Sequence, residues 1–179
     1  MRLKKGDSVT NIVLPAIDGT EFNLESLQGK RYMLSFFRFA SCPFCNLRVH
    51  ELVSRYKEFG DDFPIVAIFD SSLANLKKHT RSHQAPFPIL ADETNQCYRA
   101  YGVEHSFWGM IKGMVTRFPT LIKGIFKGYI PLIPGGSLIT MPADFLIDEN
   151  GIIQRAYYAK DEGDHLPIDE LKAFALIAD

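Results

Sequence analysis

The sequence is poor in cysteine, has no long apolar run and carries no excess charge of either sign. Three cysteines among 179 residues are too few for a fold built on disulfide bonds. The 20 basic residues are balanced by 21 acidic ones, so the overall charge gives no reason to expect nucleic acid as a partner. No apolar run approaches the roughly 18 residues of a transmembrane helix, and the positive charges near Met1 have no apolar stretch behind them, as a secretory signal would. A cytoplasmic location is expected, where thiols are kept reduced.

The composition is that of a globular chain. Hydrophobic residues make up 46% of the sequence and aromatic residues 12%, which is enough to bury a sizeable core. We predict a single domain over residues 1–179, with residues 105–139 as an insertion within it. No cofactor is predicted.

The most informative motif is Cys42-Pro43-Phe44-Cys45, which follows the apolar run 32–39 and precedes a helical pattern. A cysteine that opens a helix lies over unsatisfied backbone N–H groups and the positive end of the helix dipole, which favour its thiolate. Cys45 comes about one helical turn later, close enough to attack a mixed disulfide formed at Cys42. The motif therefore predicts a redox dithiol, with Cys42 as nucleophile and Cys45 as resolving thiol.

Two other interpretations of the cysteines are less favoured. A zinc site uses the same spacing but needs two further ligands, and the only other cysteine, Cys97, has no Cys or His partner within a few residues. A structural disulfide is the remaining alternative, and a chain without a secretory signal rarely relies on one. Catalysis is the favoured interpretation.

The hydrophobic pattern alternates between strands and helices. Segments 12–15 and 21–24 flank an Asp-Gly turn and predict an N-terminal hairpin, and an Asn-Gly turn joins the last two strands. The predicted strands cover residues 32–37, 63–69, 89–91, 145–147 and 151–158, and the predicted helices cover residues 42–60, 72–83, 95–101 and 167–178. The strand at 32–37 is apolar almost throughout, as expected of a central strand covered on both faces. The order of elements predicts an α/β fold.

Several short motifs occur together along the chain. They are Lys5-Gly6-Asp7, Asp18-Gly19 with Leu24, Leu27-Gln28-Gly29-Lys30, the strand leading into Cys42, Leu90-Ala91-Asp92, Ala100-Tyr101-Gly102-Val103 and residues 145–151. With them the chain resembles the alkyl hydroperoxide reductase/thiol-specific antioxidant family, the peroxiredoxin-like branch of the thioredoxin superfamily. The resemblance implies a thioredoxin-like fold with a central mixed sheet, flanking helices and an N-terminal extension.

The chain departs from this family at the residues that bind peroxide. Aligning the family's Pro-x-x-x-Thr/Ser-x-x-Cys motif on Cys42 puts Ser35 and Phe39 at the proline and hydroxyl positions. The place of the family's peroxide-site arginine is taken by Pro142. Pro142 instead resembles the cis-proline of thioredoxin-type reductases, whose preceding residue, here Met141, pairs with a substrate chain through its backbone.

Further residues are candidates near the dithiol. Pro43 and Phe44 resemble the Pro-aromatic spacer of glutaredoxin dithiols, although proline is also simply a good helix start. Arg38 either stabilises the thiolate by a charge-assisted hydrogen bond or is a surface arginine at a sheet edge. Asp144 either accepts a proton near the dithiol or, as the favoured interpretation has it, is a solvated residue at a strand entrance.

Three residues receive structural interpretations. His50 lies two helical turns beyond Cys42, too far for direct proton transfer, and is expected on a helix face. Cys97 is expected to be a small buried hydrophobe rather than a second resolving thiol. His165 lies in the acidic loop 161–167, which we interpret as a structural turn.

Residues 105–139 are rich in aromatic and aliphatic side chains and contain no acidic residue. Lys112, Arg117, Lys123 and Lys127 stand among the apolar residues, and three prolines interrupt the segment. The favoured interpretation is an amphipathic helical pair packed on the core. The alternatives are a lid or groove for an apolar substrate, a homodimer face, and a peripheral membrane contact.

The function predicted from these features is thiol-disulfide oxidoreduction by Cys42 and Cys45, with Arg38 and Pro142 completing the site. The expected substrate is a protein disulfide or a peroxide, a choice that the sequence leaves open, and the expected reductant is thioredoxin, glutaredoxin or glutathione. The first alternative is a peroxidase in which Cys42 forms a sulfenic acid that Cys45 resolves. The second is a non-catalytic redox sensor or membrane-interface module that recognises its partner through residues 105–139.

Overall fold

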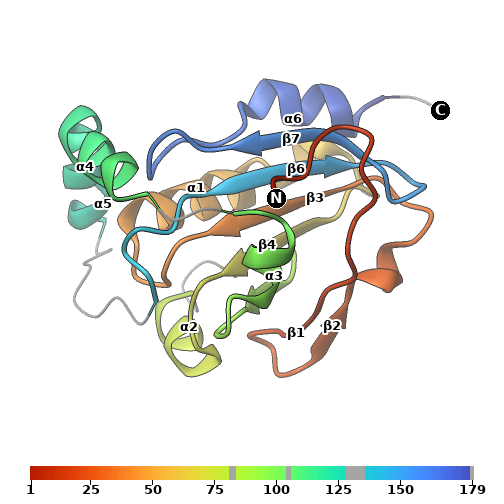
Figure 1. Cartoon of the computed structure of the whole chain (residues 1–179), viewed down its shortest axis with the longest axis horizontal. Helices are drawn as coiled ribbons and strands as arrows, with labels where there is room; N and C mark the ends of the chain where they lie inside the picture. The colour runs from red at the N-terminus through yellow and green to blue at the C-terminus, as the bar shows by residue number, and fades with distance from the viewer. Residues whose placement is uncertain (81–83, 104–105, 128–135, 178–179) are drawn as a thin grey trace.

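The computed structural model describes residues 1–80, 84–103, 106–127 and 136–177. Its centre is a five-stranded mixed sheet with the strand order β5-β4-β3-β6-β7 (Figure 1). The strands are β3 (Tyr32–Phe37), β4 (Ile65–Phe69), β5 (Ile89–Ala91), β6 (Ala143–Ile147) and β7 (Ile153–Tyr158). Strands β3, β4 and β5 pair in parallel, whereas β6 is antiparallel to both β3 and β7. This mixed sheet agrees with the predicted fold class.

Helices cover both faces of the sheet. They are α1 (Pro43–Ser54), α2 (Leu73–Thr80), α3 (Gln96–Ala100), α4 (Phe107–Thr116), α5 (Phe118–Phe126) and α6 (Ile168–Ala175), with short 3₁₀ helices η1 (Leu24–Leu27) and η2 (Tyr56–Phe59). Helices α1, α2 and α6 contribute to one buried apolar cluster, and α3 contributes to a second cluster on the other face.

The central strand β3 explains why the core divides in two. All six of its residues are buried, and alternate side chains enter opposite clusters: Met33 and Phe37 the first, Leu34 and Phe36 the second. A strand with both faces covered therefore needs a nearly continuous apolar sequence, as this one has.

Most of the predicted elements are present. The N-terminal hairpin consists of β1 (Val13–Pro15) paired antiparallel with β2 (Glu21–Asn23). The helix predicted over residues 42–60 is divided into α1 and η2 at Arg55. The helix predicted over residues 72–83 is observed to Thr80, and residues 81–83 lie outside the described ranges.

The predicted cis-proline is wrong. No described residue follows a cis peptide bond, so the bond between Met141 and Pro142 is trans, the isomer that X-Pro bonds prefer by about 0.5–1 kcal/mol. Pro142 stands at the entrance of β6, where its carbonyl accepts a hydrogen bond from the Ala159 N–H at 3.0 Å. A thioredoxin-like role for Met141 and Pro142 therefore loses its structural basis.

The insertion contains a helical pair, of which α5 packs against α1. Gly124 is buried at this contact, and a Cβ added there would lie 2.8 Å from the Pro43 Cβ, so the two helices approach closely because residue 124 is glycine. Leu121 packs against the first cluster. Pro119 falls in the first turn of α5, where it starts the helix rather than breaking it. The predicted packing on the core thus holds for one side of α5.

Asp70 joins the end of the insertion to the end of β4. This buried carboxylate accepts hydrogen bonds from the Thr140 hydroxyl at 2.6 Å, the Ser137 N–H at 3.1 Å and the Asn95 amide at 3.0 Å. Charge-assisted bonds of this kind are among the stronger ones in proteins. They hold the chain in place just before it enters β6.

We expect Tyr98→Phe to lower the free energy of unfolding by about 1 kcal/mol. The buried Tyr98 hydroxyl lies 2.5 Å from the Phe37 carbonyl and 2.9 Å from the Ile68 carbonyl, at the ends of β3 and β4. Urea unfolding followed by circular dichroism measures the change. The control is Tyr56→Phe, because that half-buried hydroxyl makes one long bond of 3.4 Å. Equal stability of the two variants would contradict the assigned role of Tyr98.

Candidate active site

Cys42 lies at the start of α1, and residues 38–41 connect it to the end of β3. It is the N-cap residue of the helix, and Pro43 occupies the first turn, where its missing N–H removes no helical hydrogen bond. Both Cys42 and Cys45 are free thiols with no exposed surface. The backbone N–H of Arg38 lies 3.4 Å from the Cys45 sulfur, which places the second thiol against the end of the central strand.

Arg38 is buried beside the dithiol and is not a surface residue of the sheet edge. Only 3% of its surface is exposed, and its Nη1 lies 3.7 Å from the Cys42 sulfur and 2.9 Å from Oε2 of Glu162. Its Nη2 donates a hydrogen bond to the Leu138 carbonyl. Its Nε is buried and has no hydrogen-bond partner among the described residues. The guanidinium therefore joins the thiol to an acidic loop far along the chain.

The pKa values of the two thiols are shifted in opposite directions. Burial by itself would raise the pKa of Cys42, but the hydrogen bond from Cys45, the charge of Arg38 and the N–H groups of the first helical turn outweigh it and lower this pKa to about 6. Burial raises the pKa of Cys45 well above its usual value, and the neighbouring Cys42 thiolate adds to the effect. At neutral pH Cys42 is the thiolate and Cys45 keeps its proton.

Glu162 was not identified from the sequence, where its loop was interpreted only as a turn. Burial raises the pKa of its carboxyl to about 7, and the negative charge on Cys42 acts in the same direction while Arg38 opposes it. The ion pair with Arg38 is nearly inaccessible to solvent, since the two side chains are 4% and 3% exposed. Glu162 therefore pairs with the guanidinium that faces the thiolate and helps to keep it charged.

Asp144 is buried and is not a solvated residue at a strand entrance. It accepts hydrogen bonds from the Ser35 hydroxyl at 2.6 Å and the Leu166 N–H at 2.7 Å, and its Oδ2 lies 3.1 Å from Nδ1 of His165. Burial opposes ionisation of Asp144, but His165 and Ser35 are among the groups that outweigh it and lower the pKa. His165 is therefore part of a buried network.

This network supports the acidic loop. The described contacts include no hydrogen bond from Ser35, Asp144 or His165 to either thiol. Leu166 and His165 follow Glu162 closely in sequence, so their bonds to Asp144 fix the loop that carries Glu162 to Arg38. Its place in the fold makes Asp144 a positioning residue.

The loop is held from its other side by the insertion. Nε of Arg117 lies 2.6 Å from Oδ1 of Asp161, and a Cβ added at Gly163 would meet Arg117 Cδ at 2.8 Å and a ring carbon of Phe44 at 3.0 Å. Residue 163 must therefore be small. A cavity of about 380 Å³ opens here, between the Phe44 end of α1, α5 and the acidic loop.

The other predicted site residues have different surroundings. Met141 and Pro142 line a separate cavity of about 100 Å³. His50 is exposed on α1, as expected. Cys97 is buried, and burial together with the charge of Asp92 raises its pKa to about 12, which fits a structural residue better than a reactive thiol.

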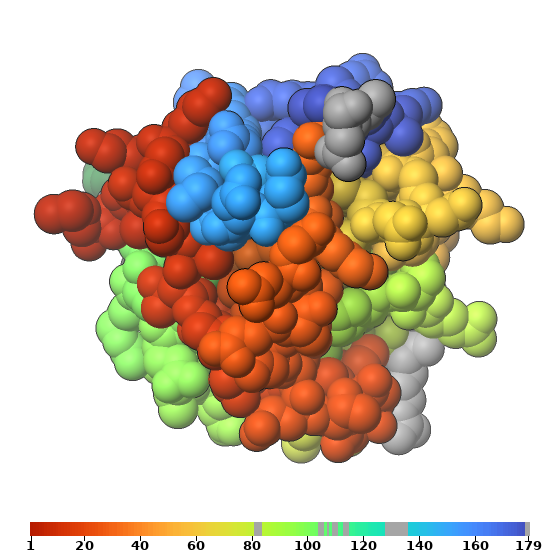
Figure 2. Space-filling view, turned by 90° about the vertical axis from the view of Figure 1, so that its right-hand side faces the viewer, coloured from red at the N-terminus to blue at the C-terminus, as the bar shows by residue number. Residues whose placement is uncertain are grey.

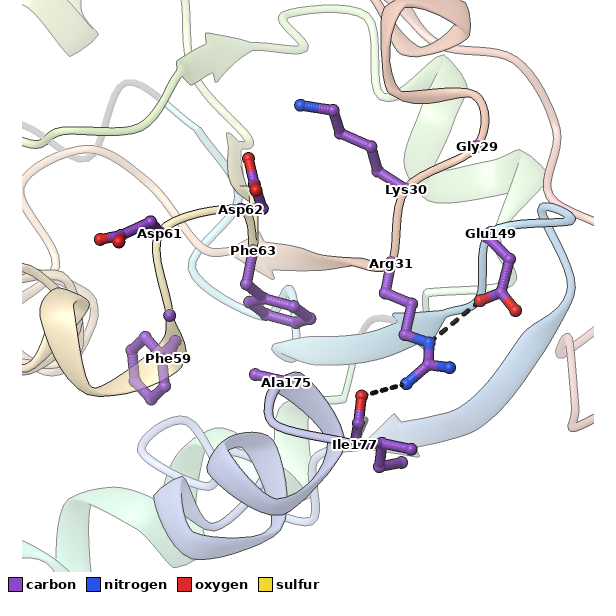
Figure 3. A pocket seen from close by; sticks show the side chains of 11 residues that line it. Gly29, Lys30, Arg31, Phe59, Asp61, Asp62, Phe63, Glu149, Ala175 and Ile177 are labelled. Carbon is purple, nitrogen blue, oxygen red and sulfur yellow. Dashed lines mark hydrogen bonds and ion pairs between the residues drawn. The ribbon is translucent and has the colours of Figure 1, made fainter. Parts of the chain in front are cut away.

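A further cavity lies at the opposite end of β3 from the dithiol. It measures about 1070 Å³ and is lined by the Gly29–Arg31 turn, the 59–63 segment, Glu149 and the end of α6 (Figure 3). Arg31 crosses it to contact Glu149 at 3.0 Å and the Ile177 carbonyl at 2.8 Å. Figure 2 shows this end of the molecule, where the segments near residues 30, 60 and 150 meet. The cavity contains no thiol and offers no counterpart to the chemistry at Cys42.

The described residues, 1–80, 84–103, 106–127 and 136–177, contain neither a cluster of metal ligands nor a membrane-spanning helix. No group of three or more His, Cys, Asp or Glu side chains there is arranged to hold a metal ion. None of the helices there is long and apolar enough to cross a membrane.

Comparisons with known proteins agree with the fold. The model of the AhpC/TSA family matches residues 5–156. Peroxiredoxin Bcp of Escherichia coli is 29% identical over 125 residues, which cover 67% of this chain and 79% of that protein. The chloroplastic peroxiredoxin Q of Triticum aestivum is 25% identical over 118 residues, covering 64% of this chain and 54% of that protein. This chain thus spans about half the length of the wheat protein.

A solved structure supports the same fold over the whole chain. The crystal structure of peroxidoxin BcpB from Mycobacterium tuberculosis superposes with a TM-score of 0.73 at 19% identity and covers 99% of this chain and 100% of that one. The predicted thioredoxin-like α/β fold is confirmed, as is the predicted resemblance. The names of the relatives support the prediction of a thiol-dependent oxidoreductase.

We expect the Cys42 thiolate to form as the pH rises through about 6. Absorbance of the reduced protein at ultraviolet wavelengths that detect thiolate, with Cys42→Ser subtracted, measures this titration. Arg38→Met should move the midpoint upward, because it removes the positive charge 3.7 Å from the sulfur.

Arg155→Met is the matched control, since Arg155 forms an exposed ion pair with Glu170. A wild-type midpoint near the value of about 8.5 for free cysteine, or the same shift in both variants, would show that Arg38 does not activate the thiol.

Proposed function

The chain belongs to the AhpC/TSA family, and on that premise we propose that it is a thiol-dependent peroxidase in which Cys42 attacks the peroxide and Cys45 resolves the product. The observation that carries the proposal is the buried guanidinium of Arg38, 3.7 Å from the sulfur of a cysteine whose pKa is lowered to about 6. This group places a positive charge and hydrogen-bond donors where a peroxide would react.

The first step is attack of the Cys42 thiolate on the terminal oxygen of a hydroperoxide. The O–O bond breaks, Cys42 becomes a sulfenic acid, and the leaving alkoxide takes up a proton to become an alcohol or, from hydrogen peroxide, water. Arg38 stabilises the negative charge that passes to the departing oxygen. Its Nε, which has no partner among the described residues, is available as a donor.

The second step is condensation of the two cysteines. The sulfur of Cys45 attacks the sulfenic sulfur of Cys42, a disulfide forms, and the hydroxyl leaves as water with the proton of Cys45. The raised pKa of Cys45 means that this thiol still carries its proton at neutral pH, and the sulfur gives up that proton as it attacks, because the thiolate is the nucleophile. Two thiols of thioredoxin, glutaredoxin or glutathione then reduce the disulfide and are oxidised to one disulfide in their turn.

Arg38 substitutes for the arginine that the family carries in the late strand. Pro142 occupies that place here, so a guanidinium has to come from another element. Arg38 enters from the residue following β3, and Glu162 fixes its orientation. Substrate contacts are expected from Pro43 and Phe44, because Phe44 lines the cavity of about 380 Å³ at the start of α1.

Thiol-disulfide oxidoreduction is the second candidate. The spacing Cys-Pro-Phe-Cys favours it, because this spacing lets the second thiol release a mixed disulfide formed on the first. The sequence alone favours thiol-disulfide oxidoreduction over peroxidase activity. The names of the relatives, which are peroxiredoxins, now favour the peroxidase.

The test is to react the reduced protein in parallel with hydrogen peroxide, an organic hydroperoxide and a small disulfide, using stopped-flow fluorescence and mass spectrometry. Wild type should consume peroxide and form the Cys42–Cys45 disulfide. Cys45→Ser should stop at a sulfenic acid on Cys42, heavier by one oxygen and trapped by dimedone. Cys42→Ser should not react.

Cys97→Ser is the matched control and should behave as wild type, because Cys97 is buried in the second cluster. Slow reaction with both peroxides together with rapid exchange with the disulfide would reject the peroxidase and establish the second candidate.

A further inference from the structure

The helical pair α4–α5 exposes large apolar side chains at one end of the molecule. Figure 1 shows the pair beside α1, at the opposite end from the C-terminus. Trp108 is 78% exposed, Val115 73%, Phe118 58% and Phe126 87%. Scattered exposed apolar residues are ordinary, but four on two adjoining short helices form a patch of the kind that marks an interaction surface.

Helix α5 packs only part of its apolar surface against the rest of the chain. Leu121 and Gly124 point toward α1 and the core. Phe118 and Ile125 flank Leu121 at i−3 and i+4, and Phe126 lies further round the helix, yet all three are exposed. Packing within the chain therefore does not account for the apolar character of the outer side.

The charges around this patch are all of one sign. Lys112, Lys123 and Lys127 are exposed, and no acidic residue occurs between residues 106 and 127. Among the described residues, the acidic partners of this segment are Asp161 and Asp164, which both pair with Arg117 on the side that faces the loop. Residues 106–127 thus carry positive charges only, whereas the whole chain has a net charge of −1.

We propose that the outer face of α4–α5 binds peripherally to an anionic lipid bilayer. Exposed tryptophan and phenylalanine side chains insert at the level of the headgroups, and flanking lysines contact the lipid phosphates. Helices of 10 and 9 residues are too short to cross a bilayer but suffice to lie along its surface. A second copy of the chain fits this face less well, because a symmetric contact would bring the same lysines together.

The helix that carries part of this surface packs with its other side against the dithiol motif. Gly124 on the inner side of α5 is packed against Pro43, the residue that follows Cys42. Binding through the outer side leaves this contact unchanged and brings the start of α1 close to the membrane.

The test uses the full-length protein and its single tryptophan, Trp108. Vesicles of phosphatidylcholine with phosphatidylglycerol should shift the Trp108 fluorescence to shorter wavelength and co-sediment with the protein. Vesicles of phosphatidylcholine alone should bind much more weakly, and added salt should release the protein from the anionic vesicles.

The triple variant Lys112→Glu, Lys123→Glu, Lys127→Glu should bind anionic vesicles at least a hundredfold more weakly, because each basic residue near such a surface contributes about a factor of five. The matched control reverses three exposed lysines elsewhere, Lys30, Lys57 and Lys78. Circular dichroism and the Cys42 titration confirm that both variants are folded.

Three results would overturn the proposal. They are the absence of binding to anionic vesicles at low salt, equal loss of binding in the two triple variants, and a dimer in sedimentation velocity that Phe118→Ser and Phe126→Ser dissociate. The last result would assign the face to a second copy of the chain. None of these measurements depends on peroxide turnover, so they fail or succeed separately from the proposed activity.

Discussion

The structure of the site depends on one buried cation. Arg38 lies between the Cys42 sulfur at 3.7 Å and the Glu162 carboxylate at 2.9 Å, in a setting almost closed to solvent. Burial would lower the pKa of a guanidinium, but the two thiols and Glu162 outweigh this and raise it, so the charge is retained. A buried charge is tolerated only when it is paired. Here the guanidinium of Arg38 is paired with both the Cys42 thiolate and the Glu162 carboxylate.

The surrounding elements keep this group of three charges together. Because Glu162 lies 124 residues after Arg38, the acidic loop must be held firmly against the start of α1. Asp144 holds it from the sheet through His165 and Leu166, and Arg117 holds it from α5 through Asp161. The insertion, β6 and the dithiol helix are thus parts of one arrangement. Because these parts bury Cys42 completely, the electrostatic interactions of its thiolate are stronger than they would be in water.

The sequence predicted the elements and the reacting thiols but not the groups that support them. Local signals sufficed for the apolar strand β3, for the turn pairs of the two hairpins and for Cys42 at a helix start. Arg38 was identified as a candidate because it stands four residues before Cys42. Asp144, His165 and Glu162 were misjudged or missed because their contacts join positions far apart in the chain, such as Ser35 with Asp144. The cis bond expected at Pro142 came from resemblance alone, and the strand entrance accommodates the trans form.

The most direct test of the account is the rate at which Cys42 reacts with hydrogen peroxide in Arg38→Lys and Arg38→Met. It is measured at a pH high enough that Cys42 is fully ionised in both variants, so thiolate content cannot explain a difference. If the guanidinium stabilises the leaving oxygen, both variants react at least tenfold more slowly than wild type, and the methionine variant is the slower. Rates equal to wild type would contradict the central role assigned to Arg38 and reduce it to a structural partner of Glu162.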